Sequence, residues 1–105
     1  EPVESRVRLF SLDLGSFKSI EDFCVQFQEQ QLPLHVLINN AGIYSLKNFE
    51  TTEDGFEKQW GTNHLGHFLL TMRLMPQLKA AAPSRVVFVA SRAHGDTGFQ
   101  WDFNV

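Results

Sequence analysis

The chain of 105 residues carries a formal net charge of -3, and 43% of its residues are hydrophobic while 20% are charged. This balance excludes a disordered tail, and the mixed signs of charge argue against a nucleic-acid-binding surface. No run approaches the roughly 20 apolar residues that span a bilayer, so no membrane segment is predicted in the given chain. The only cysteine, Cys24, excludes a disulfide-stapled scaffold and fits a reducing compartment.

The first third of the chain predicts a strand followed by a helix. Residues 6–12 are rich in β-forming and apolar types, and they predict a strand that ends at Asp13. The apolar spacing over residues 17–31 is helical, and Ser16 or Ser19 is expected to cap this helix.

A second strand and a long helix are predicted next. Residues 34–38 form an apolar run that is too short for a helix. A helical pattern then extends from about 53 to 81, and Thr51 and Asp54 have the spacing of a capping box at its start. Pro76 is expected to kink or shorten the last turns of this helix.

A third strand completes the pattern. Residues 85–90 form a continuous apolar run, and the tail over residues 92–105 is interpreted as a loop that leads into an incomplete element. The order β-α-β-α-β, with strands that are apolar throughout, is typical of a parallel sheet covered on both faces. The predicted fold is therefore α/β, the central portion of a doubly wound, Rossmann-type parallel sheet that is incomplete at both ends.

Each predicted strand is followed by a small polar residue. Asp13 follows the first strand, Asn39 and Asn40 follow the second, and Ser91 follows the third. Ligands of such sheets bind outside the carboxyl ends of the strands, which makes these residues a candidate site. The same residue types are also common wherever a strand turns, and this structural interpretation stays open.

Asn63 lies in the middle of a stripe that the long helix is expected to bury. The other members of the stripe are Phe56, Trp60, His67, Leu70 and Leu74. A buried amide without a partner costs roughly 1–3 kcal/mol, so we expect Asn63 to be hydrogen-bonded. It either bridges backbone groups as a structural residue, or organises a water or a catalytic side chain beneath the site.

The opposite face of the long helix is also apolar. It carries Leu65, Phe68, Leu69 and Met72. A helix that is apolar on both sides is either deeply buried or packed on a partner subunit. We therefore expect a homo-oligomer contact through the helix 53–81.

Two apparent motifs in this helix lack the residues that their chemistry needs. Residues 61–66 imitate the start of a phosphate loop, but His67 and Phe68 replace the required Lys and Ser/Thr, and the chain has no G-x-G-x-x-G. His64 and His67 have no acidic or cysteine ligand near them in the sequence, so no metal site is predicted.

Four motifs stand in order along nearly the whole chain. They are Leu12-Asp13-Leu14, Asn39-Asn40-Ala41-Gly42, Asn63-His64-Leu65-Gly66-His67-Phe68 and the strand that ends Val89-Ala90-Ser91. In this order and at these spacings they resemble the short-chain dehydrogenase/reductase family. The stretches 52–56, 82–87 and 91–94 are most similar to the retinol-dehydrogenase-like branch of that family.

The resemblance implies a nicotinamide cofactor, NAD or NADP, and an alcohol or carbonyl substrate that is retinoid-, steroid- or lipid-like. It implies that Asp13, followed by Leu14, binds the adenine amino group. The backbone of Asn40, Ala41 and Gly42 would line the adenosine ribose, and an Asn side chain would tie the central strands together.

The resemblance also implies two catalytic residues. Asn63 would hold a water near the catalytic lysine of the family. Ser91 would hydrogen-bond the substrate oxygen and stabilise the charge that develops on it. The general acid/base of the family is a tyrosine with a lysine four residues later, but the only tyrosine here, Tyr44, is followed by Lys47 at the wrong spacing.

We therefore expect residues 1–105 to be a partial dinucleotide-binding domain. The first βα unit with its glycine loop is expected before Glu1, and the Tyr-x-x-x-Lys segment beyond Val105. The segment alone is predicted to be inactive. The alternative is a truncated, non-catalytic binding or dimerisation module. A flavodoxin-like regulator is disfavoured, because it would need an acidic cluster at the strand ends and only Asp13 is present.

Overall fold

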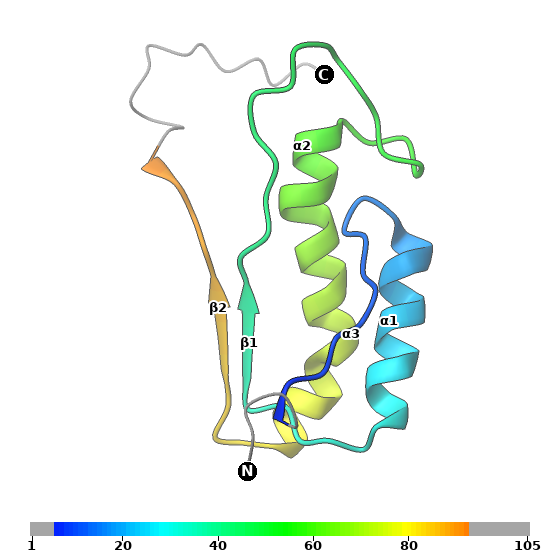
Figure 1. Ribbon diagram of the computed structural model, residues 1–105. Coiled ribbons are helices and arrows are strands. Elements are labelled where there is room, and N and C mark those ends of the chain that lie inside the picture. Colours follow the sequence, from blue (N-terminus) through cyan, green and yellow to red (C-terminus); the bar gives the residue numbers. More distant parts are fainter. Residues whose placement is uncertain (1–5, 93–105) are drawn as a thin grey trace.

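The computed structural model describes residues 6–92 as two strands and a helical column packed on a further helix. The elements in chain order are α1 (Phe17–Glu29), β1 (Val36–Asn39), α2 (Lys58–Trp60), the π-helical turn η2 (Gly61–Leu65), α3 (Gly66–Ala80) and β2 (Arg85–Phe88). Helix α3 packs against α1 on one side and against β1 on the other (Figure 1). The described chain is thus part of an α/β fold of Rossmann type, as the alternation of strands and helices predicted.

The two strands of the described chain are parallel neighbours. Their register places Val36 opposite Arg85 and Asn39 opposite Phe88. One further hydrogen bond, from Val89 N to Asn39 O at 3.0 Å, continues the pairing beyond the assigned strand. Because the strands are parallel and joined through the helical column, their carboxyl ends lie at the same edge of the sheet.

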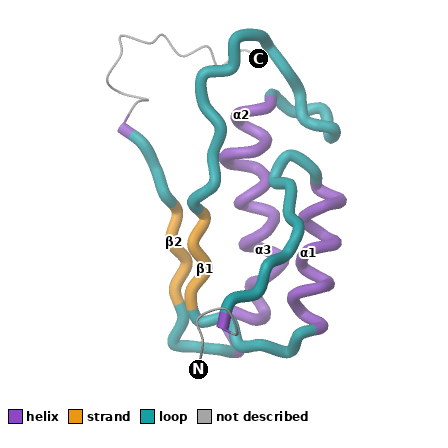
Figure 2. Tube along the Cα trace, viewed as in Figure 1, coloured by secondary structure: helices purple, strands orange, loops and turns teal. Residues whose placement is uncertain are grey.

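The prediction of a strand over residues 6–12 is wrong for this chain. Figure 2 shows the segment as a loop beside the helices, apart from β1 and β2. Leu12 packs against the core, and the ring of Phe10 meets Phe23 edge-on at 5.7 Å. A strand forms only where a neighbour shares its hydrogen bonds, and within residues 6–92 the sheet pairs β1 with β2 alone.

Helix α1 confirms the second predicted element. Ser16 is its cap rather than Ser19, since Ser16 Oγ accepts a hydrogen bond from Ser19 N at 3.1 Å. Ser19 instead lies within the helix, and its Oγ accepts a hydrogen bond from Asp13 N at 2.8 Å. The helix buries Ile20 and Cys24 against α3.

The long helix begins later than predicted, at Lys58 rather than near residue 53. Its cap is Glu57, whose carboxylate accepts hydrogen bonds from Gln59 N and Trp60 N, each at 2.8 Å. The predicted capping box at residues 51–54 is wrong, because residues 52–55 form a tight turn closed by a hydrogen bond from Gly55 N to Thr52 O at 2.9 Å, ahead of the helix.

The helical column then continues through Pro76 to Ala80, so the helix does not end at this proline. Within residues 6–92, no helix is long and apolar enough to cross a membrane. The third predicted strand is confirmed as β2, although it is two residues shorter. Most of the predicted tail, residues 93–105, lies outside the described part of the chain.

The hydrophobic core lies between α1 and α3. Its buried members are Leu14, Ile20, Cys24, Leu70 and Leu74. The outer face of the helical column is uncovered within the described chain, and Phe68 is 56% exposed there. Of the four apolar residues expected on the second face of this helix, Phe68 and Met72 are exposed, whereas Leu65 and Leu69 are partly buried and Leu69 packs against the core.

Candidate functional site

The candidate site lies at the carboxyl edge of the two strands. The loop over residues 40–43 follows β1, and Ser91 follows β2 at the same edge. A cleft of about 280 Å³ opens beside this loop. Its lining residues are Asp13, Gly15, Ile43, Thr51, Thr52, Glu53, Lys58 and Thr62. Asp13 and the loop after β1 therefore share one cleft, although they are about 30 residues apart in the sequence.

Asp13 is held in a fixed orientation at the wall of this cleft. Its Oδ1 accepts a hydrogen bond from Gly15 N at 2.8 Å, and its main-chain oxygen accepts one from Ser16 N at 3.1 Å. A Cβ on Gly15 would lie 3.2 Å from Asp13 Oδ1 and 3.3 Å from Thr62 Oγ1, which explains a glycine at this point. Asp13 is exposed, so its carboxylate can accept a hydrogen bond from a ligand.

Leu14 lies in a different environment from Asp13. Its side chain is 8% exposed and belongs to the core, so only its main chain could face a ligand. The Leu14 carbonyl packs directly on the start of α3, where a Cβ on Gly66 would lie only 2.3 Å from Leu14 O. This contact fixes the loop that carries Asp13 against the helical column.

Asn63 clamps the loop after β1. Ile43 N donates a hydrogen bond to Asn63 Oδ1 at 2.9 Å, and Asn63 Nδ2 donates one to Ile43 O at 2.8 Å. Gly42 lies beside this clamp, since a Cβ there would be 3.5 Å from Asn63 Oδ1. Of the two roles considered for Asn63, its side chain performs the bridging of backbone groups in this structure.

The predicted burial of Asn63 within an apolar stripe is wrong. His67, Leu70 and Leu74 are buried, but Asn63 is exposed and Trp60 is 54% exposed. The cause is the π-helical turn η2, which adds one residue and rotates the preceding side chains by about 100° relative to α3. A pattern with a single helical period cannot describe both sides of this turn.

The two asparagines that follow the predicted second strand have different surroundings. Asn39 is 3% exposed, and its Nδ2 donates a hydrogen bond to Thr71 Oγ1 of α3 at 3.0 Å. Its Oδ1 accepts no hydrogen bond within the described residues. Asn40, Ala41 and Gly42 are exposed at the strand edge. Asn39 thus ties β1 to the helical column, while residues 40–42 are accessible to a ligand.

The acidic turn that forms one wall of the cleft was not predicted as part of the site. Asp54 Oδ2 accepts a hydrogen bond from Phe17 N at 2.8 Å, and Glu53 accepts one from Ser16 Oγ. Both carboxylates therefore sit at the N-terminus of α1, where negative charge is stabilised. In the sequence they suggested a cap of the nearer helix, because capping patterns identify local partners only.

The remaining polar candidates do not form a separate site. The His64 ring lies against Trp60, tilted by 31° with ring centroids 4.3 Å apart, whereas His67 is buried. No group of three or more potential metal ligands is found among residues 6–92. Burial raises the pKa of the Cys24 thiol to about 11, so this cysteine is protonated and unreactive near neutral pH.

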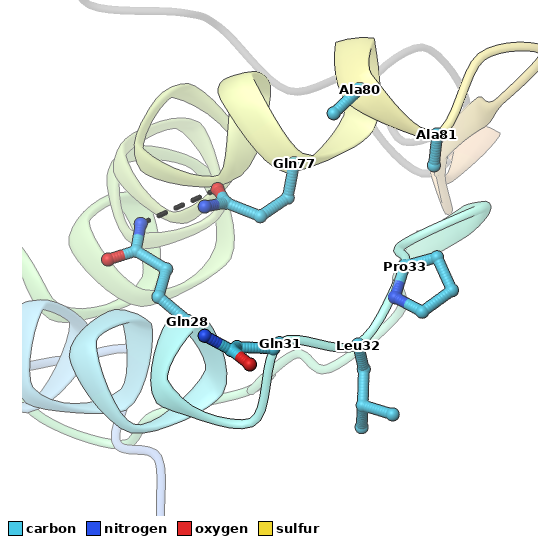
Figure 3. A pocket seen from close by; sticks show the side chains of 7 residues that line it. All are labelled: Gln28, Gln31, Leu32, Pro33, Gln77, Ala80 and Ala81. Atoms are coloured by element: carbon cyan, nitrogen blue, oxygen red, sulfur yellow. Dashed lines mark hydrogen bonds between the residues drawn. The ribbon is translucent and has the colours of Figure 1, made fainter.

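A second cavity lies at the opposite end of the fold. It has a volume of about 350 Å³ and is enclosed by the last turns of α1 and α3 and the segments that lead into the strands (Figure 3). Across it, Gln28 Nε2 donates a hydrogen bond to Gln77 Oε1 at 3.4 Å. It carries no ionisable side chain and lies at the amino ends of the strands, so the cleft beside Asp13 is the better candidate.

The sequence is similar to known proteins along most of its length. The sequence profile of the short chain dehydrogenase family matches residues 1–102. Human retinol dehydrogenase 13 (Homo sapiens) is 49% identical over 94 residues, which cover 90% of this chain and 28% of that protein. Polyprenol dehydrogenase of Mus musculus is 48% identical over 93 residues, covering 85% of this chain and 28% of that protein.

A solved structure shows the same arrangement. The crystal structure of an uncharacterized protein from Mycobacterium Paratuberculosis is 43% identical and superimposes with a TM-score of 0.67, covering 84% of this chain and 30% of that one. The chain spans little more than a quarter of the length of the curated relatives that it matches. The matched residues extend over almost all of the sequence, and the chain therefore belongs to the short-chain dehydrogenase family.

Proposed function

We propose that this chain is the central part of an oxidoreductase that transfers a hydride between a nicotinamide dinucleotide and an alcohol or carbonyl substrate. The observation that carries the proposal is the clamp between Asn63 and Ile43, which holds the loop after β1 beside Asp13 at the carboxyl edge of the strands. Parallel sheets of this type bind dinucleotides at that edge. Membership of the short-chain dehydrogenase family supports the same chemistry.

The residues around the cleft suit the adenosine half of NAD or NADP. Asp13 would accept a hydrogen bond from the adenine amino group, while Leu14 contributes its main chain. The exposed backbone of Asn40, Ala41 and Gly42 would line the ribose. The cleft wall carries Glu53 as well as Asp13, and two carboxylates would repel a pyrophosphate. The bound dinucleotide supplies or accepts the hydride.

Two residues are proposed to take part in the chemical step. Ser91 follows β2, where its hydroxyl would hydrogen-bond the substrate oxygen and stabilise negative charge as it develops. Asn63, at the same edge, would organise a water in the proton path in addition to bridging the backbone of Ile43. The general acid/base is expected outside this chain, so catalysis needs the Tyr-x-x-x-Lys segment of a longer protein.

The proposed substrate is an apolar alcohol or its carbonyl product, of retinoid-, steroid- or lipid-like chemistry. Several relatives that are 48–51% identical to this chain are named for retinol or polyprenol. Both names denote long apolar alcohols. The alternative of a non-catalytic binding or dimerisation module is less well supported, because these dehydrogenases match along most of the chain.

A chimera tests the proposal directly. Residues of this chain replace the matched 94-residue segment of human retinol dehydrogenase 13. We expect oxidation of retinol that depends on NAD or NADP. Ser91→Ala should lower kcat by about 100-fold, while the Kd of the dinucleotide changes little. Asp13→Ala should raise that Kd by about tenfold or more and leave kcat at saturation nearly unchanged.

Two results would contradict the proposal. A folded chimera that binds no dinucleotide would exclude the cofactor site. A chimera that binds dinucleotide but oxidises or reduces no apolar alcohol or aldehyde would exclude the proposed reaction. Ser91→Thr, which keeps a hydroxyl, is the matched control and should retain more activity than Ser91→Ala.

We also propose that the long helix mediates contact between two copies of the protein. An exposed row along one side of the column comprises Trp60, His64, Phe68 and Met72. Contiguous exposed apolar surface of this kind marks an interaction site. Phe68→Glu should convert a dimer to a monomer in analytical ultracentrifugation, and an unchanged mass would contradict this contact.

A further inference from the structure

His67 is a buried histidine that none of the proposed catalytic steps uses. It lies in the first turn of α3 and is 5% exposed. Its Nδ1 is 2.9 Å from the main-chain oxygen of Asn63, four residues earlier. Because a carbonyl oxygen can only accept a hydrogen bond, the Nδ1 atom must carry the proton and donate it.

This hydrogen bond is one link in a continuous series. His67 donates to the main chain of Asn63, and the side chain of Asn63 bonds both polar backbone atoms of Ile43. Ile43 lines the cleft that also contains Asp13. A buried side chain of α3 is thereby connected to the strand edge through two residues.

Asn63 lies in a segment of unusual helix geometry. Asn63 is the central residue of η2, where Gly66 N bonds Gly61 O across five residues instead of the usual four. π-Helical turns are rare and poorly favoured by themselves. Gly66 and His67, by contrast, belong to α3, and Gly66 is fixed tightly against Leu14 O. The hydrogen bond from His67 couples the η2 backbone to this fixed point.

We infer that His67 is a positioning residue, which orients Asn63 and through it the loop of residues 40–43. This inference rests on the proposed function, because the loop is assigned there to the adenosine half of the cofactor. His67 itself touches neither cofactor nor substrate in this scheme. It acts by keeping the Asn63 side chain aligned with the backbone of Ile43.

Three substitutions separate positioning from a purely structural role in the core. His67→Leu fills a similar volume but has no donor. His67→Asn places an amide nitrogen where Nδ1 lies and so retains the donor. His64→Leu makes the same chemical change on the exposed side of the column, at a residue of the proposed dimer contact that belongs to neither the cofactor site nor the catalytic residues, and serves as the control.

The experiment measures exchange of the Ile43 amide and the Kd of NAD and NADP. Hydrogen exchange of the Ile43 amide is followed by NMR in the full chain. In the retinol dehydrogenase 13 chimera, both this exchange and dinucleotide binding are measured. His67→Leu should accelerate Ile43 exchange relative to core amides by about tenfold and raise the Kd by about tenfold, the equivalent of one hydrogen bond. His67→Asn should restore both to within about threefold, and His64→Leu should change neither.

Either of two outcomes overturns the inference. In the first, His67→Leu lowers the Tm but changes Ile43 exchange no more than that of core amides. In the second, His67→Asn behaves like His67→Leu. Failure of the proposed function is distinguishable, because the parent chimera would then bind no dinucleotide while Ile43 exchange still depended on the residue at position 67.

Discussion

Replacing Gly66 with alanine should destabilise this protein, although the same change usually stabilises a helix. Gly66 has φ -62°, an ordinary helical value, so no backbone strain demands a glycine. Alanine in a helix interior is favoured over glycine by roughly 0.5–1 kcal/mol. The objection is steric, because a Cβ on Gly66 would lie 2.3 Å from Leu14 O and 3.1 Å from Leu14 C.

The size of the effect follows from the atoms that clash. Overpacking of a buried contact costs about 1–3 kcal/mol, and the upper end applies here because the obstructing atoms are backbone rather than a flexible side chain. Subtracting the gain in helix propensity leaves a loss of about 2 kcal/mol. For a domain of this size, that loss corresponds to a fall in Tm of roughly 8–16 °C.

Urea unfolding of three glycine variants provides the assay. At Gly61 the added Cβ would lie 2.6 Å from the Thr52 side chain, and at Gly42 it would lie 3.5 Å from Asn63 Oδ1, an ordinary contact. We expect the loss of stability to fall from Gly66→Ala through Gly61→Ala to Gly42→Ala. A Gly66→Ala protein as stable as the parent would refute the close contact between α3 and the loop at Leu14.

Three further predictions concern single side chains. Thr71→Val should cost about 1–3 kcal/mol in denaturant unfolding, because it leaves the buried amide nitrogen of Asn39 without its hydrogen-bond acceptor. Thr71→Ser should cost less, and equal losses for the two variants would contradict this. Glu57→Ala should cost about 0.5–2 kcal/mol and lower helicity in circular dichroism, since it removes the cap of α2, and unchanged helicity would argue against that role. The pKa of the Cys24 thiol is raised by burial from 9.0 to about 11, so its contribution to stability should be complete below pH 9 and lost as the pH rises through 11. Cys24→Ala should remove this part of the pH dependence of the unfolding free energy, and a parent curve flat from pH 8 to 11 would contradict the shift.

Local patterns predicted those elements whose partners are inside the chain. The helix over residues 17–29 buries its apolar stripe against α3, and β1 pairs with β2, so periodicity and composition described them well. Residues 6–12 have an equally strong strand pattern but do not form a strand. A strand needs a neighbour to share its hydrogen bonds, and the described sheet, which consists of β1 and β2, offers this segment no neighbour. Composition indicates which segments can form strands, but pairing decides which do.

The details of the site were less predictable for two physical reasons. Capping patterns name residues near in sequence, yet the carboxylates of Glu53 and Asp54 bind the N-terminus of α1, about 37 residues away. The π-helical turn changes the phase of the long helix, so the expected burial of Asn63 failed while that of His67 held. Gly61 and Gly66, the two glycines at the ends of the turn, were the sequence feature that marked an irregularity in this helix.

The π-helical turn also explains how one helix can hold three parts of the strand edge at once. Thr71 bonds Asn39 of β1, Gly66 packs on the Leu14 carbonyl, and Asn63 bonds Ile43. An uninterrupted α-helix would rotate the residues before the turn by about 100° relative to Thr71, so the contact of Asn63 with the loop depends on the π-helical turn. The rare π-helical turn is therefore accompanied by contacts at the Leu14 carbonyl and at Ile43, and Ile43 lines the cleft beside Asp13.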